Sequence, residues 1–510
     1  MAKKFYVTTP IYYANGLPHI GHAYSSFIAD GYARYKRLLG YDVKFSTWVD
    51  ENSQKIVQKA EELGKWIMEF LDEIADGSVK IWDALNISYT DFIRTTEPRH
   101  HAFVQKVLSK VYNDWKWEDI YKGEYKWLYC VWCEAFKNER DLVNGLCPDH
   151  QTKPDVITEK NWFFKLSNYQ DKLLELFVKN PTFVEPASRF NEVKSFVNSG
   201  VEDFSISRET NTFGIPLPFD PSQVTYVWFD ALLNYITVCQ EEKEKFWSDD
   251  TYILHVLGKD IVKFHATYWP AMLMSAWYRL PDKEFVTWYL TVDGQKMSKS
   301  LWNIIDPVQV AQDYDRDAVV FYLLYDAPIG ADWDFSRERF AWTYDSILIW
   351  AWGNLVNRVV SLCDKYWIKE GRAHPTLDFF ADFDLNNIEK RYLDVWHVHL
   401  YLQDWYKIVQ QANEYITKQE PWKKYKDEAT KQDALDDLSF LLYVVKNLAL
   451  LSAPFMINGF AKIQSIFGNE LLSKLNSSKN MLNDDFVKAY QEKTFSVNLK
   501  PEIIYQKKLP

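Results

Sequence analysis

The chain has 510 residues, more than one hydrophobic core usually holds, so we expect two or three domains. Apolar residues make up 47% and charged residues 25%, and no apolar run reaches the roughly 18 residues of a membrane helix, so we expect neither a membrane span nor a signal peptide, and a cytoplasmic location. The formal net charge of -11 excludes a generally basic nucleic-acid binder, although a local basic face could still bind phosphates.

The first predicted elements are a strand, a turn and a helix. An apolar run over residues 5–9 precedes His19-Ile20-Gly21-His22, and apolar residues then recur at helical spacing from Ala23 to Leu39. The free N–H groups and positive dipole end of such a helix attract an anion, and a small residue at position 21 lets a nucleotide approach closely. By itself the peptide also fits a helix start with two hydrogen-bonded histidines.

Strand and helix signals alternate through residues 1–115, with a strand at Val43–Thr47 and a helix at Gln54–Leu63, which indicates the first half of a doubly wound, Rossmann-like parallel sheet. Residues 116–225 break this rhythm with paired cysteines and turn-rich peptides. Alternation resumes over residues 226–340, so we expect an insertion that splits an α/β sheet. Residues 341–510 carry long amphipathic segments, such as Asp433–Ser452, and are predicted to form an α-helical bundle.

Four potential metal ligands lie within residues 126–152 of the insertion. Cys130-x-x-Cys133 is followed by Cys147-x-x-His150, which has the ligand count and spacing of a tetrahedral zinc knuckle. Because the protein would fill all four positions, such a zinc ion would stabilise the fold and activate no water. The alternative is a set of free buried thiols.

A second candidate phosphate-binding peptide, Lys296-Met297-Ser298-Lys299-Ser300, lies far from the first in sequence. By itself it fits a solvated surface loop. A doubly wound sheet brings distant peptides together at the carboxyl ends of its strands, where imidazoles and ammonium groups could stabilise charge on a reacting triphosphate. The two peptides together therefore indicate a reaction at the α-phosphate of ATP.

This pair of peptides resembles the signature of the class I aminoacyl-tRNA synthetases, and further stretches are similar to the methionyl-tRNA synthetase family. The similar stretches are residues 9–16, 226–231, 258–261 and 292–301, with further matches at 354, 358 and 421–422. The resemblance implies a ligase that uses ATP with Mg²⁺ to activate L-methionine and then charges tRNA(Met), including initiator tRNA. From the Cys/His spacing we expect one structural zinc ion, and we expect a monomer because no strand-rich RNA-binding module follows the predicted helical bundle.

The resemblance assigns roles to individual residues. His19 and His22 would stabilise the α-phosphate, and Lys296 and Lys299 would neutralise the β- and γ-phosphates. The implied ATP contacts are Gly21, Gly258, Asp260, Met297 and Ser298, with Asp260 on the ribose. The implied methionine pocket is Ile11, Tyr13, Trp228, Leu232, Tyr235 and His265, with Asp50 on the substrate's ammonium group.

Residues 341–510 would bind the anticodon, with Asn354, Arg358 and Trp422 reading unstacked bases by hydrogen bonds and stacking. Without the resemblance, an Asn/Arg pair at this spacing is usually a solvated helix face. The chain departs from the family pattern at Asn52-Ser53, where His-Gly is frequent, and at Thr287, where histidine is common. Neither departure touches the phosphate-binding peptides.

Tryptophan is unusually abundant: 22 Trp exceed 17 Gly. Several stand where the family motifs carry glycine, namely Trp48, Trp127, Trp132, Trp288, Trp302 and Trp333. We hypothesise that the source organism reads UGA as glycine and that a different translation table rendered it as tryptophan. Trp228, Trp269 and Trp422 stand where the family itself has tryptophan.

Three other functions stay open from the sequence. Cysteinyl-tRNA synthetase is a rival that holds zinc at its amino-acid site, and this zinc would need an open coordination position. A non-catalytic tRNA-binding relative would follow if the tryptophans at glycine positions are real. A small-molecule adenylyltransferase would share the first peptide but leaves residues 341–510 unexplained.

Overall fold

The structure is a computed structural model that describes residues 3–114, 118–130, 135–137, 142–148, 151–242, 245–292, 294–297, 303–327, 330–381, 383, 388–393, 397–468 and 483–507. A parallel sheet lies at its centre. The strand order is β2 (Tyr12–Tyr13), β3 (Asp42–Asp50), β1 (Lys4–Thr8), β12 (Thr251–Gly258), β13 (Lys283–Thr287) and β8 (Val184–Glu185), and β4 (Asp91–Arg94) also pairs with β3. The predicted parallel α/β architecture is therefore confirmed.

The strand order reverses between β1 and β12. From β1 the chain extends the sheet through β3 and β4, and it returns much later to add β12 and β13 on the other side of β1. In sheets of this kind, ligands bind outside the carboxyl ends of the strands at such a reversal. The topology thus marks one edge of the sheet as the place for a site.

Helices cover both faces of the sheet. Phe5 and Val7 of β1 are buried in the same cluster as α1 (Ile20–Leu38), whereas Tyr6 between them is buried on the other face with α7 (Val227–Gln240). This alternation follows from the two-residue period of a strand. The other helices of this part are α2 (Gln54–Glu62), α3 (Ile67–Ala84), α4 (Pro98–Asp114), a π-helical turn η3 (Phe264–Tyr268) and α8 (Trp269–Ser275).

The insertion forms an antiparallel sheet with two helices beside it. Its long strands β5 (Ile120–Cys130) and β7 (Asp155–Phe164) pair with each other, flanked by β6 (Ala135–Lys137) and β9 (Phe204–Ser205). The helices are α5 (Gln170–Lys179) and α6 (Ala187–Asn198), with a short 3-10 turn η2 (Leu166–Tyr169) before them. Between α5 and α6 the chain contributes β8 to the edge of the central sheet, and β10 (Ser207–Arg208) pairs with β11 (Val224–Thr225) beyond α6.

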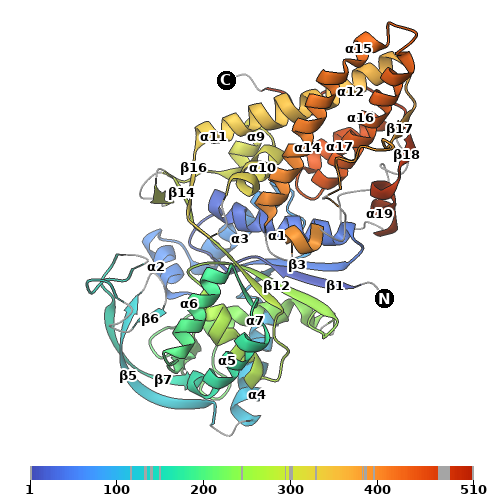
Figure 1. The fold of residues 1–510 in the computed structure, drawn as a ribbon. Helices are drawn as coiled ribbons and strands as arrows, with labels where there is room; N and C mark the ends of the chain where they lie inside the picture. Colours follow the sequence, from blue (N-terminus) through green and yellow to red (C-terminus); the bar gives the residue numbers. More distant parts are fainter. Residues whose placement is uncertain are drawn as a thin grey trace.

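A small three-stranded sheet follows the central one. It contains β14 (Leu290–Val292), β15 (Gln295–Lys296) and β16 (Trp333–Phe335), and α9 (Pro307–Asp313) and α10 (Arg316–Asp326) lie between β15 and β16 in the chain. One continuous helical stretch then runs through α11 (Arg337–Thr343), η5 (Tyr344–Gly353) and α12 (Asn354–Lys365). Figure 1 shows this stretch leading from the sheet region into the helical C-terminal part.

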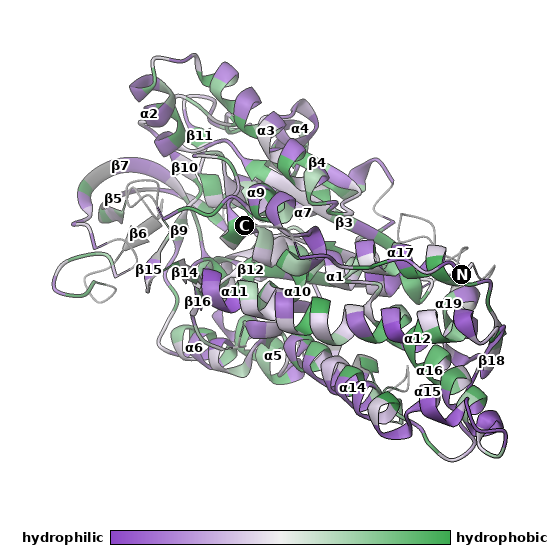
Figure 2. Cartoon of the chain, turned by 90° about the horizontal axis from the view of Figure 1, so that it is seen from above, coloured by the Kyte–Doolittle hydropathy of each residue, from purple (hydrophilic) through white to green (hydrophobic). Residues whose placement is uncertain are grey.

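Helices dominate the C-terminal part, as predicted. They are η6 (Glu389–Leu393), α14 (Val398–Gln419), α15 (Pro421–Lys424), α16 (Lys431–Ser452), α17 (Ile457–Phe467) and α19 (Asn483–Gln491), and β17 (Glu370–Arg372) pairs with β18 (Thr494–Ser496). Apolar residues of α14 are buried at helical spacing, and Figure 2 shows hydrophobic and hydrophilic residues mixed along this helix. The bundle therefore buries one face of α14, whereas residues 440–452 of α16 are buried on all sides.

A buried ion pair joins α10 to α1, and a hydrogen bond from the same arginine reaches the helical C-terminal part. Arg316 at the start of α10 donates to Asp30 of α1 at 3.0 Å and to the carbonyl of Phe455 at 2.6 Å. Asp30 also accepts from Arg34 at 2.8 Å, and the charges of Arg34 and Arg316 lower its pKa against the opposing effect of burial. A buried pair of this kind is strongly destabilised when one partner is removed.

One described helix, Arg337–Lys365, is long and apolar enough to cross a membrane by length and composition alone. Half of its most apolar window is buried inside the protein. A helix of this composition that packs in a protein core passes the same test, so the finding is weak evidence for a membrane span.

Candidate active site

The two histidines of the first peptide lie at the start of α1. His19 is the N-cap residue, and its Nδ1 accepts from the backbone N–H of Gly21 at 3.0 Å, while Nδ1 of His22 accepts from the backbone N–H of His19 at 3.1 Å. Because both Nδ1 atoms accept, a neutral ring carries its proton on Nε2. Their ring centroids are 4.0 Å apart, so the pair presents two N–H donors near the amino end of a 19-residue helix.

The second peptide approaches the first at Gly21. A Cβ atom built on Gly21 would lie 3.1 Å from Cε of Met297 and 2.9 Å from Cε1 of His19. The backbone N–H of Ile20 also donates to the carbonyl of Ile305 at 3.0 Å, which holds the chain after the second peptide against the helix start. The structure therefore brings the two peptides together, and glycine at position 21 leaves the space that they share.

A tight hairpin positions the backbone of Lys296. Thr291 of β14 pairs with Lys296 of β15, and Gly294 between the strands has φ 71°, a conformation that glycine adopts readily. The N–H of Gly294 donates to Asp334 of β16 at 2.7 Å, which anchors the turn. Ser298 and Lys299 lie outside the described residues.

Gly258 ends strand β12 at the same edge of the sheet, and Lys259 and Asp260 follow it in a turn. Asp260 is exposed, whereas Lys259 forms an ion pair with Asp332 at 2.7 Å. A Cβ on Gly258 would come within 2.6 Å of an Asp260 carboxylate oxygen, so glycine lets this carboxylate fold back over the strand end. An exposed carboxylate at this position is well placed to accept hydrogen bonds from hydroxyl groups.

The residues assigned to a methionine pocket gather around an aromatic cluster. Trp228 stacks on Phe264 with centroids 3.8 Å apart and meets the edge of Tyr13 at 6.4 Å. Ile11, Leu232 and Tyr235 are buried in the same core cluster, and Asp50 is 1% exposed at the end of β3. Phe264 was not assigned to the pocket from the sequence, although its position next to His265 on one helical turn could have indicated that it contributes a ring.

Tyr235 and His265 form a short buried hydrogen bond. The Tyr235 hydroxyl lies 2.6 Å from Nε2 of His265, and Nδ1 of His265 lies 3.0 Å from the carbonyl of Ile261. A carbonyl can only accept, so Nδ1 carries the proton and Nε2 accepts from tyrosine. Burial lowers the pKa of His265 to about 4, so the ring is neutral near pH 7.

The two departures from the family pattern keep polar partners. Asn52 is buried and donates to the carbonyl of Thr95 and to Asp230, each at 3.2 Å. Thr287 ends β13, and its hydroxyl lies 3.2 Å from that of Ser25 in α1. Both side chains therefore have hydrogen-bond partners near the carboxyl ends of the strands.

Trp48 is fully buried against the aromatic cluster that contains Tyr235. Its Nε1 donates to the carbonyl of Pro10 at 2.8 Å, and its ring meets Tyr235 edge-on at 4.3 Å. An indole fits at this position of the structure, so geometry at residue 48 does not favour glycine.

The predicted zinc ligands are only partly described. Cys130 ends β5 and is 1% exposed, and Cys147 is fully buried with its N–H donating to the carbonyl of Thr152 at 2.8 Å. Cys133 and His150 lie outside the described residues. Within the described ranges, no group of three or more potential ligands could hold a metal ion, so the zinc knuckle stays a prediction.

The predicted anticodon residues come together in part. The guanidinium carbon of Arg358 in α12 lies 5.7 Å from the ring centroid of Trp422 in α15, and both side chains are half-buried. Asn354 lies one turn before Arg358 on the same helix and is also half-buried. A cation over an indole face leaves stacking and hydrogen-bonding groups side by side.

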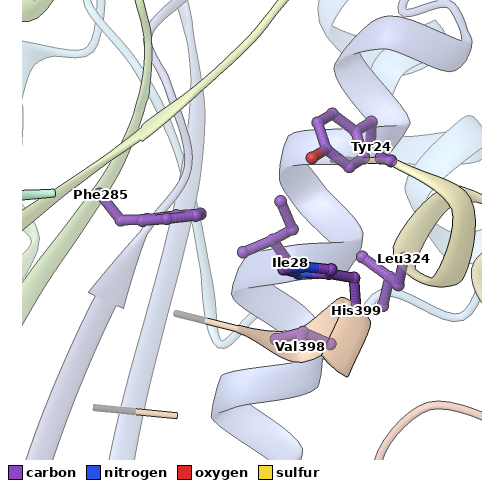
Figure 3. A pocket seen from close by; sticks show the side chains of 7 residues that line it. Tyr24, Ile28, Phe285, Leu324, Val398 and His399 are labelled. Carbon is purple, nitrogen blue, oxygen red and sulfur yellow. The ribbon is translucent and has the colours of Figure 1, made fainter. Parts of the chain in front are cut away.

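A pocket elsewhere in the molecule contains none of the predicted site residues. Figure 3 shows it between α1, α10 and α14, lined by Tyr24, Ile28, Phe285, Leu324, Ala327, Val398 and His399. Burial lowers the pKa of His399, with a smaller contribution from His397. The lining is mostly apolar and lacks the converging cationic groups that a triphosphate needs.

The model of the family described as tRNA synthetases class I (M) matches residues 5–155 and 150–360. With the reversed parallel sheet and the two converging peptides, this match defines a class I tRNA synthetase. The chain is 41% identical to a methionine–tRNA ligase of Caldanaerobacter subterraneus over 90% of this chain and 73% of that protein, and 41% identical to one of Nostoc sp. over 91% and 90%. The chain therefore belongs to the methionine–tRNA ligase family.

Solved structures agree with this assignment. The fold matches the crystal structure of Mycobacterium tuberculosis methionyl-tRNA synthetase bound by methionyl-adenylate with a TM-score of 0.89 and 34% identity, covering 99% of this chain and 100% of that one. The apo form from the same organism matches with a TM-score of 0.82 and 32% identity, covering 100% of this chain and 99% of that one. The similarity thus extends through the insertion and the helical bundle.

Proposed function

We propose that this chain forms methionyl-adenylate where the start of α1 meets the peptide around Met297. As a methionine–tRNA ligase, the chain activates L-methionine with ATP and transfers methionine to the 3′ end of tRNA(Met). The observation that carries the placement is the approach of Met297 to Gly21, which joins two peptides from opposite ends of the catalytic part. Each peptide is suited to bind phosphate, and their meeting gives a triphosphate two sets of partners.

In the activation step, a carboxylate oxygen of methionine bonds to the α-phosphorus while the bond from that phosphorus to the pyrophosphate oxygen breaks. Negative charge grows on the α-phosphoryl oxygens and on the departing pyrophosphate. The Nε2–H groups of His19 and His22 would donate to the α-phosphoryl oxygens, and Lys296 and Lys299 would neutralise the pyrophosphate. In the second step, a terminal tRNA hydroxyl attacks the carbonyl of the adenylate and AMP leaves.

Mg²⁺ would accompany ATP and neutralise phosphate charge. Among the ATP contacts, Gly21 and Gly258 would allow close approach, Asp260 would accept from the ribose hydroxyls, and Met297 and Ser298 would flank the phosphates. The exposed carboxylate of Asp260 at the end of β12 supports its part in this assignment.

For the amino acid, we place the methionine thioether among Ile11, Tyr13, Trp228, Leu232, Tyr235 and His265. Sulfur gains from contact with ring edges, and this cluster supplies several rings. The Tyr235–His265 bond fixes both side chains, and the neutral imidazole adds no charge that would repel the substrate's ammonium group. Asp50, buried at the end of β3, would bind that ammonium group.

For tRNA, we propose that Asn354, Arg358 and Trp422 read the anticodon, because the Arg358–Trp422 pair offers a stacking face beside hydrogen-bond donors. Initiator tRNA would be read in the same way. We place the enzyme in the cytoplasm as a monomer.

Structural zinc would be held by Cys130, Cys133, Cys147 and His150. The two described thiols are buried, and a Cys₃His donor set suits tetrahedral zinc. Bound there, zinc would tie the end of β5 to the turn at Cys147 and take no part in the reaction.

Isotope exchange between pyrophosphate and ATP tests this placement. We expect exchange to require methionine and to be insensitive to cysteine, and His19→Asn to reduce it by about 10²–10³-fold, the usual cost of removing one donor to a developing oxyanion. His374→Asn is the matched control, because His374 lies in the helical part beyond β17, and it should leave exchange unchanged. Cysteine-dependent exchange, or equal losses in both variants, would contradict the proposal.

A further inference from the structure

Two helices of this structure end at a tryptophan with left-handed backbone geometry. Trp277 follows α8 with φ 60°, and Trp367 follows α12 with φ 58°. Bulky side chains rarely adopt this region, because their Cβ approaches the neighbouring carbonyl oxygen. The hydrogen bonds around each tryptophan explain why its backbone adopts this conformation.

Both helix ends have the hydrogen bonds of a Schellman motif, a reversal in which two N–H groups beyond the helix bond back to its last carbonyls. After α8, Tyr278 donates to the carbonyl of Leu273 at 2.9 Å and Trp277 donates to that of Met274 at 3.4 Å. After α12, Ile368 donates to the carbonyl of Cys363 at 2.9 Å and Trp367 donates to that of Asp364 at 3.2 Å. The tryptophan takes the left-handed position of the motif in both cases.

The ends of α1, α2 and α3 show other residues that take this position. After α1, Gly40 has φ 77° and Tyr41 donates to the carbonyl of Lys36 at 3.0 Å. After α2, Gly64 has φ 63°, and after α3 the position is held by Asn86 with φ 51°. Glycine and asparagine are the residues that enter this region at least cost.

Both indoles lie largely in solvent, so burial of the ring offsets little of this strain. Trp277 is 69% exposed and Trp367 is 77% exposed. The ammonium of Lys369 lies 5.6 Å from the ring centroid of Trp367, which is an exposed contact of small energy. By contrast, Trp269 and Trp405 are fully buried, and their Nε1 atoms donate at 3.2 Å to Nε2 of His255 and at 2.9 Å to the carbonyl of Leu448.

We infer that the polypeptide made in the source organism carries glycine at positions 277 and 367, each encoded by UGA. Backbone geometry, exposure and hydrogen bonding at two positions outside the family motifs lead to this assignment, independently of the motif argument for residues such as Trp288. The same criteria assign tryptophan to positions 269 and 405. At these four positions, the two buried tryptophans are therefore genuine and the two exposed ones stand for glycine.

Peptide mass measurement on the protein purified from its source organism tests the inference. Trypsin releases Phe264–Arg279, which contains one position of each kind, so Trp269 is an internal control for position 277. We expect the fragment spectrum to give the mass of tryptophan at 269 and glycine at 277, and the peptide ending at Lys369 to give glycine at 367. Tryptophan at 277 or at 367 would overturn the inference.

Thermal unfolding tests the geometric argument separately. In protein made with tryptophan at the disputed positions, Trp277→Gly and Trp367→Gly should each raise Tm, by up to a few degrees, because glycine removes the left-handed strain. Trp342→Gly is the matched control: Trp342 is 61% exposed inside α11, where glycine weakens a helix and should lower Tm. A lowered Tm in all three variants would contradict the argument from backbone geometry.

Discussion

Two hydrogen bonds at the candidate site determine which ring nitrogen of His19 and of His22 can donate to a phosphate. Nδ1 of His19 and of His22 accept from the backbone, which leaves Nε2–H as the donor of each neutral ring. Two such donors can bind phosphoryl oxygens without first losing a proton. The residue types could be predicted from the peptide, but the tautomers could not, because they depend on the hydrogen bonds that cap the start of α1.

Removing the hydroxyl of Tyr235 should impair methionine binding. Tyr235→Phe leaves Nε2 of His265 without its 2.6 Å partner, and an unpaired buried acceptor costs about 1–3 kcal/mol. We expect KM for methionine to rise about 5- to 100-fold with a lower Tm, measured by pyrophosphate exchange and calorimetry. Tyr169→Phe is the control: it removes a hydroxyl that donates to Asp119, so Tm should fall while KM stays constant.

Glu284 should make folding stability depend on pH. Both carboxylate oxygens are buried without a hydrogen-bond partner among the described residues, and burial raises the pKa of this group well above 4.5. The folded state therefore keeps the proton at pH values where the unfolded chain has lost it, so the free energy of unfolding falls as pH rises above about 4.5.

Urea denaturation of Glu284→Gln at pH 5 and pH 8 measures this contribution. The variant carries no titrating group at 284, so we expect its loss of stability between these pH values to be smaller than that of the unaltered chain, by roughly 1–3 kcal/mol. Identical pH dependence in both proteins would mean that Glu284 ionises normally in the fold.

At the scale of helices and strands, the hydrophobic pattern predicted the type of each element better than its limits. The predicted strand Val43–Thr47 extends to Asp42–Asp50, because Trp48 to Asp50 continue to pair with β2 and β4. The helix predicted from Ala23 begins at Ile20, since the histidine cap includes three more residues. The pairing of β8 with β13 had no local signal, because two residues carry no periodicity.

The contact between α12 and α15 should matter for tRNA and not for methionine activation. Arg358→Ala removes the cation from the face of Trp422, and loss of such a stacking and hydrogen-bonding partner costs about 1–3 kcal/mol in single-stranded recognition. We expect kcat/KM for tRNA charging to fall about 5- to 100-fold while pyrophosphate exchange is unchanged. Arg372→Ala changes an exposed residue of β17 and should affect neither reaction, and equal effects of the two substitutions would argue against anticodon reading by Arg358.

For the molecule as a whole, the candidate site depends on convergence of segments that are far apart in sequence. The reversal of strand order between β1 and β12 brings the first peptide and the Gly258 strand end to one edge, and the β14–β15 hairpin adds Met297. The sequence motifs indicated that these segments meet, because each is suited to phosphate. The sequence does not predict that Met297 is the side chain that approaches Gly21, because this contact depends on tertiary packing and not on a local pattern.

The central claim is that the two peptides act on the same triphosphate, and a double-mutant cycle on methionine-dependent pyrophosphate exchange tests it most directly. His22→Asn, Lys296→Gln and the double variant would be compared with the unaltered chain. Groups that act together on one transition state give non-additive losses, so we predict that the double variant loses clearly less than the product of the two single losses. Single losses that multiply in the double variant, or a single substitution without effect, would contradict the account.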